Sequence, residues 1–158
     1  MKKTTTAFSI AIALLLTFGA LSQAWSIEKI EADKKAVELI NNFMKALQIE
    51  DATKREAAAL KFLHKSMLTN DGKMPSSLKN YSFKKACDGV KFYDVPVKIT
   101  EVHKGRSVTV GFKETAERGR TDKYFVGKKE GAAGRPAPLH VFWPEGGGKP
   151  MLINVGSL

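Results

Sequence analysis

The stretch VPVKITEV, from Val95 to Val102, marks the point where the sequence changes from helical to strand periodicity. Val95, Val97 and Ile99 alternate with proline or polar residues, which is typical of a strand with one buried face. The alternation then slips by one residue, so that Val102 falls on the opposite face, and we expect a bulge or bend at the slip. The chain therefore divides into a helical half before this stretch and a strand-rich half after it.

Two amphipathic helices are predicted on the N-terminal side of this stretch. Residues 27–49 carry apolar side chains at three- and four-residue intervals, which is the period of a helix with one buried face. Thr53 and Glu56 then have the spacing of a capping box, whose side chains satisfy the free amides at a helix start. A second helix is therefore expected to begin just after Thr53 and to stop near the turn sequence at 70–72. Residues 73–92 show no sustained period and are predicted to form a loop with one short helical turn.

Turn residues are expected to divide the C-terminal half into short strands. The dipeptide KG at 104–105 is predicted to close a hairpin, and RG at 118–119 to form the next turn, because glycine supplies the backbone freedom such turns need. A glycine- and proline-bearing loop at 130–138 precedes the strand LHVFW at 139–143. The last strand is expected at 151–155.

This order of elements predicts an α+β fold. Two N-terminal helices would pack on one face of a curved antiparallel sheet of four to six strands, because the sequence lacks the alternation of strands and helices that builds parallel sheets. The expected core joins one face of the helices to one face of the sheet. Its predicted members are Phe43, Leu47, Leu60, Leu63, Val97, Ile99, Val108, Val110 and Val141.

The first 24 residues have the three parts of a secretory signal peptide. Two lysines follow Met1, an apolar run covers 7–21, and Ser22 and Ala24 are small residues at the −3 and −1 positions of a cleavage site. The apolar run is too short for a comfortable membrane span. We therefore predict export, cleavage after Ala24 and a single mature domain over 25–158, in the periplasm or the extracellular medium.

The glycine-rich segment EGGGK at 145–149 is interpreted as a hairpin tip and not as a phosphate-binding loop. A P-loop needs a serine or threonine after its lysine and then a helix, whereas Pro150 follows Lys149 here and a strand pattern comes next. No nucleotide partner and no cofactor are therefore expected.

Candidate acid–base residues are few and carry no motif. The three histidines, His64, His103 and His140, lie far apart in the sequence, so no metal site is predicted. His140 is the best placed of them, on the strand LHVFW, and Tyr93 with Asp94 is the one adjacent carboxylate and phenol. These three side chains, His140, Tyr93 and Asp94, are the catalytic candidates.

The chain is strongly basic, with a formal net charge of +10, which favours anionic partners. Lys128, Lys129 and Arg135 form one cluster in or beside a predicted loop and are the candidate ligand-binding residues. No aromatic residue interleaves with the basic clusters in the sequence, as a nucleic-acid stacking platform would require. Cys87, the single cysteine, cannot form an intramolecular disulfide.

Two segments carry a resemblance to a known superfamily. Residues 34–68, KKAVELINNFMKALQIEDATKREAAALKFLHKSML, together with 138–158, PLHVFWPEGGGKPMLINVGSL, resemble the nuclear transport factor 2-like superfamily, the cystatin-like α+β cone. The resemblance implies a sheet wrapped around a helix with a conical pocket, and a homodimer through the sheet. The superfamily includes ketosteroid isomerase-like and polyketide cyclase-like enzymes, association domains and exported proteins of unassigned function. The isomerases' catalytic tyrosine and aspartates have no residue-by-residue match here.

We therefore expect an exported, non-catalytic binding or interaction module with a cone-type pocket for a small molecule or a protein. Two alternatives stay open at this point. One is an isomerase- or hydrolase-like enzyme that uses the pocket, and the other is a basic surface protein that binds an anionic envelope polymer.

Overall fold

The computed structural model describes residues 28–158. The predicted signal peptide and its cleavage site lie outside these residues. Within them, no helix combines the length and the apolar character that crossing a membrane requires.

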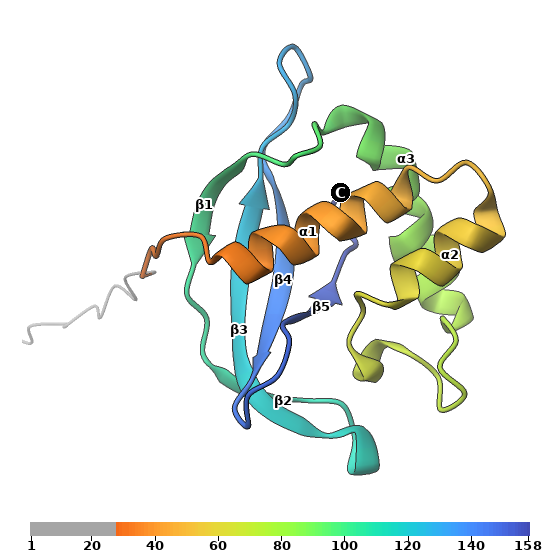
Figure 1. Cartoon of the computed structure of the whole chain (residues 1–158), viewed down its shortest axis with the longest axis vertical. Coiled ribbons are helices and arrows are strands. Elements are labelled where there is room, and N and C mark those ends of the chain that lie inside the picture. The colour runs from red at the N-terminus through yellow and green to blue at the C-terminus, as the bar shows by residue number, and fades with distance from the viewer. Residues whose placement is uncertain (1–27) are drawn as a thin grey trace, which may run out of the picture.

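Helix α1, Lys34–Leu47, crosses one face of the sheet (Figure 1). It begins where the side chain of Asp33 accepts a hydrogen bond from the backbone amide of Lys35, at 2.7 Å. Its apolar face is buried against the strands, as the periodicity of 27–49 predicted, although the helix is shorter at its N-terminal end. The residues on this buried face are Ala36, Leu39, Ile40, Phe43, Met44, Ala46 and Leu47.

Helix α2, Ala52–Leu60, differs from the prediction at both ends. Asp51 caps it by accepting from the amide of Lys54 at 2.7 Å, so the predicted capping box is wrong. The helix also stops well before 70–72, because residues 62–64 run beside the last strand. There Leu152 N donates to Phe62 O at 2.9 Å, and His64 N donates to Leu152 O at 2.8 Å. A short 3-10 helix, η1 (Lys65–Met67), follows.

The prediction of a loop over 73–92 is wrong, because most of this segment is helical. A π-helical turn, η2 (Leu78–Phe83), continues into α3 (Lys84–Gly89) and the 3-10 helix η3 (Val90–Phe92). Phe83, Ala86 and Val90 lie three and four residues apart and are buried. This short apolar stripe stabilises the helices by packing, while Pro75 and the serines before it hide the period in the sequence.

Five strands form one antiparallel sheet, which confirms the predicted α+β class (Figure 1). They are β1 (Ile99–His103), β2 (Ser107–Val110), β3 (Glu117–Val126), β4 (Ala137–Pro144) and β5 (Met151–Asn154). The order is β1-β3-β4-β5, and β2 also pairs with β3. The predicted bulge is confirmed, since the β1–β3 register shifts between Ile99 and Glu101. Strand β1 begins later than predicted, because the amide of Val97 donates to Asn41 of α1 at 2.7 Å.

Two predicted turns are wrong. The dipeptide at 104–105 closes no hairpin, because β1 pairs with 123–126 and β2 with 117–120 along the same edge of β3. The dipeptide at 118–119 lies inside β3, and the chain reverses instead at 111–116, around the 3-10 helix η4 (Lys113–Thr115). Glycine occurs at both dipeptides because the backbone is crowded there, and not because the chain turns. A Cβ on Gly105 would overlap the Thr121 carbonyl, and one on Gly119 would meet Phe142 and the Trp143 carbonyl.

The segment EGGGK is the tip of a hairpin, as predicted. Strands β4 and β5 pair antiparallel, with Phe142 opposite Met151. Gly147 and Gly148 have φ of 82° and 121°, conformations that residues with a Cβ rarely adopt, so the glycines serve the turn.

Most predicted core residues are buried, but not those of β2. Phe43, Leu47, Leu63 and Val141 are buried, and Leu60, Val97 and Ile99 pack against the core while partly exposed. Val108 and Val110 do not join the buried cluster. Strand β2 lies at the end of the sheet that extends beyond α1 (Figure 1), so this helix does not cover it.

Candidate anion-binding site

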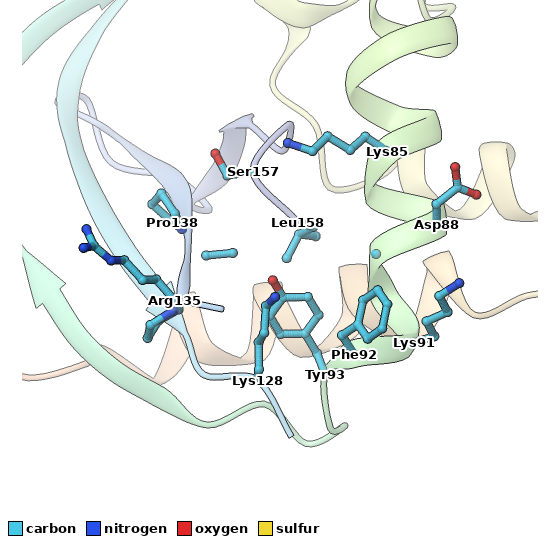
Figure 2. A pocket seen from close by; sticks show the side chains of 13 residues that line it. Lys85, Asp88, Lys91, Phe92, Tyr93, Lys128, Arg135, Pro138, Ser157 and Leu158 are labelled. Atoms are coloured by element: carbon cyan, nitrogen blue, oxygen red, sulfur yellow. The ribbon is translucent and has the colours of Figure 1, made fainter. Parts of the chain in front are cut away.

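A surface hollow of about 490 Å³ lies where α3 and η3 meet the loop between β3 and β4 (Figure 2). We call it the Phe92 hollow. Its charged lining residues are Lys85, Asp88, Lys91, Lys128 and Arg135, and its aromatic ones are Phe92 and Tyr93. The last residues of the chain, Ser157 and Leu158, close one side.

One backbone hydrogen bond brings the two halves of this lining together. Lys129 N donates to Phe92 O at 3.0 Å, which joins the chain after β3 to the end of η3. The loop then folds back on itself, with Lys128 Nζ donating to Ala133 O at 2.5 Å. Gly134 has φ of 105°, and a Cβ there would lie 2.6 Å from Lys128 Nζ. The loop therefore places Lys128 beside Phe92.

Phe92 is an exposed aromatic ring held between two ammonium groups. The residue is 43% exposed. Lys91 Nζ lies 5.2 Å and Lys128 Nζ 5.6 Å from the ring centroid, within the range of cation–π attraction. In Figure 2 the two lysines lie to either side of the ring. The ring thus holds two positive charges at the surface of the hollow.

The hollow has an excess of positive charge. Lys85, Lys91, Lys128 and Arg135 face a single acidic side chain, Asp88. Within residues 28–158, none of the four cations forms an ion pair. Cations gathered in excess over acidic side chains raise the local concentration of anions.

Tyr93 adds a hydrogen-bond donor to this positive surface. The residue is 5% exposed, and its hydroxyl points toward the hollow in Figure 2. A tyrosine hydroxyl with its ordinary pKa is already protonated at neutral pH, and burial raises the pKa of Tyr93 further. It can therefore donate a hydrogen bond to an oxyanion.

A second hollow, of about 450 Å³, adjoins the first. Its lining includes Lys91 and Phe92, which also line the first hollow, together with Lys129 and Glu130. We call it the Lys129 hollow.

The structure brings together some of the predicted site residues and separates others. Tyr93, Lys128 and Arg135 line the Phe92 hollow, and Lys129 lines its neighbour. His140 lies on β4 between Lys123 and Asn154, away from this lining, and its pKa is lowered by burial and by Lys123. Asp94 is exposed and lines neither hollow.

Lys91 and Phe92 line both hollows but were not singled out from the sequence. Phe92 and Lys128 are far apart in the sequence, yet the ring lies between lysines from two segments of the chain. The sequence pattern that could have revealed them is the three- and four-residue spacing of Phe83, Ala86 and Val90, which is typical of a helix.

The other two histidines have structural contacts. His64 is buried, accepts from the backbone amide of Ser66 at its Nδ1 (3.1 Å) and so caps η1. Its Nε2 lies 3.2 Å from a Glu117 carboxylate oxygen, and its ring packs edge-on against Phe142. The hydrogen bond from His64, followed by that from Lys65, lowers the pKa of Glu117. His103 packs against Phe125, with ring centroids 4.6 Å apart.

Comparisons with known proteins identify no relative. No family model matches the chain, and it shows no significant match to a curated protein or to a solved structure. Among the described residues, no group of three or more histidine, cysteine, aspartate or glutamate side chains could hold a metal ion.

Proposed function

We propose that this protein is an exported, non-catalytic binding module that holds an anionic group in the Phe92 hollow. The observation that carries the proposal is the gathering of Lys85, Lys91, Lys128 and Arg135 around one hollow without ion-pair partners. Such a surface attracts anions and gains by pairing with them. The Tyr93 hydroxyl supplies a neutral donor beside these charges.

Two features favour binding over catalysis. The space between α1 and the sheet is filled by fully buried side chains, among them Phe43, Met44, Leu47, Tyr124 and Leu139. A ligand is therefore expected at the surface and not in the interior of a cone. The predicted acid–base candidates also do not converge, because Tyr93 lines the hollow while His140 and Asp94 do not.

Titration with pyrophosphate tests the anion site. Replacing Lys128 or Arg135 by glutamine should weaken binding about tenfold, because each change removes a charge-assisted contact worth about 1.5 kcal/mol. Lys54→Gln, on an exposed position of α2, is the matched control and should leave the affinity unchanged. Binding should also weaken as ionic strength rises. Equal affinities for all three variants, measured by calorimetry or NMR titration, would contradict the assignment.

Export has its own test, which does not depend on the ligand. The signal sequence predicts cleavage after Ala24, so mass spectrometry of the exported chain should find Trp25 as its first residue. Recovery of a mature chain that still begins at Met1 would refute cleavage.

A further inference from the structure

The two hollows beside η3 form adjoining parts of one basic surface. The Phe92 hollow and the Lys129 hollow share Lys91 and Phe92 in their linings. The Phe92 hollow adds Lys128 and Arg135, and the Lys129 hollow adds Lys129. A ligand that extends past the Phe92 ring would therefore meet cations on both sides of it.

We infer that this double hollow binds a linear polyanion whose phosphate groups occupy the two hollows in succession. The inference rests on the proposed function, because it assumes that the Phe92 hollow takes an anion. One phosphate group would lie against Lys128 and Arg135, and another against Lys91 and Lys129. Two hollows of about 490 and 450 Å³ give room for successive groups of one chain.

The cations of the two hollows suit phosphate groups. Most of the positive charge comes from lysine ammonium groups, which are compact point charges with donors in several directions. Such donors match the tetrahedral array of phosphate oxygens, and the guanidinium fork of an arginine also binds phosphate through two hydrogen bonds. Arg135 is the single arginine in the two linings.

The Phe92 ring positions two lysine ammonium groups and does not serve as a stacking platform for bases. Lys91 and Lys128 already lie over the ring, at 5.2 and 5.6 Å from its centroid. A nucleobase could stack on the ring only by displacing these two lysines. We therefore expect a ligand that consists of phosphate groups without bases. Asp88 and Glu130 are the acidic side chains of the two linings, and they are outnumbered by the five cations Lys85, Lys91, Lys128, Lys129 and Arg135.

The decisive variant is Lys129→Gln, because Lys129 lines the second hollow and not the first. Inorganic polyphosphate of defined length and orthophosphate, which has a single phosphate group, are titrated against this variant, the parent protein and Lys54→Gln. We expect Lys129→Gln to weaken polyphosphate binding about fivefold while orthophosphate binding stays unchanged. Lys54→Gln should change neither, and thermal unfolding midpoints should confirm that all three proteins are equally folded.

Each other outcome identifies the step that fails. If orthophosphate does not bind the parent protein, the proposed anion site itself is wrong. If orthophosphate binds but Lys129→Gln leaves polyphosphate affinity unchanged, the site is real and the second hollow is not used. Equal affinity for poly-glutamate of matched charge would overturn the phosphate assignment. Tighter binding of an oligodeoxythymidine with the same number of phosphates would instead place a base on Phe92 and overturn the exclusion of stacking.

Discussion

Replacing Arg120 by methionine is expected to lower the free energy of unfolding by about 3 kcal/mol, because it leaves the buried Asp122 carboxylate without its counterion. Asp122 is 0% exposed. Arg120 Nε donates to its Oδ1 at 3.0 Å, and Nη2 donates to its Oδ2 at 2.9 Å. The effect is placed at the lower end of the range for buried pairs, because the Arg120 side chain is 41% exposed. Urea denaturation of the purified variant measures the loss.

A second substitution separates the charge from the packing. Asp122→Asn removes the negative charge but keeps an oxygen that can accept from the amide of Gly105, which now donates to Asp122 at 3.0 Å. The double variant Arg120→Met/Asp122→Asn should therefore be more stable than Arg120→Met alone by about 1–2 kcal/mol. Arg118→Met is the matched control on the same strand. Its partner Glu145 is exposed, so the cost should stay within about 0.5 kcal/mol. A double variant no more stable than the single one would show that the buried charge is not the cause.

The substitution Gly105→Ala is expected to destabilise the fold by about 3 kcal/mol, at the upper end of the range for overpacking. A Cβ at this position would overlap the carbonyl oxygen of Thr121, which is a backbone atom of β3 and cannot move aside without disturbing the strand pairing. The same displacement would loosen the hydrogen bond from Gly105 N to Asp122. Thermal or urea unfolding of the variant gives the measurement.

Gly146→Ala provides the comparison for this substitution. Gly146 lies at the tip of the β4–β5 hairpin, where an added Cβ meets nothing within 4 Å. Its φ is not among the positive values found at other glycines, so alanine fits the backbone. The change in stability should stay within about 0.5 kcal/mol. Similar losses for both variants would mean that the crowding between Gly105 and Thr121 does not constrain the sheet.

The predictions that succeeded were those that depend on residues close in the sequence. The apolar periodicity of 27–49 correctly predicted α1, because residues three and four apart lie on the same face of a helix regardless of what packs against that face. The hairpin at 145–149 likewise follows from glycines and prolines that act on their own backbone. The predictions of a capping box at 53, a loop over 73–92 and a hairpin at 104–105 were wrong. In each case the local structure is decided by contacts with distant residues or by a competing neighbour in the sequence.

The candidate site could be predicted in part. Tyr93 was singled out as a catalytic candidate, and Lys128, Lys129 and Arg135 as one ligand-binding cluster, and all four line the hollows beside Phe92. That Tyr93 and this cluster come together was not predictable from spacing. Lysines in two segments separated by three strands come together because of the backbone hydrogen bond between Lys129 and Phe92.

The sequence alone determined the class of fold, since helical periods come first and strand periods follow, and local periodicity selects which face each element buries. It also determined the excess of basic residues and the glycine-rich hairpin tip at 145–149. Tertiary structure decided that β1 and β2 share one edge of β3, and that Gly105 marks a close backbone approach and not a turn. It likewise decided where the basic residues collect. The physical reason is that strand pairing and loop docking depend on contacts between residues far apart in the chain, whose geometry is set only when the whole core packs.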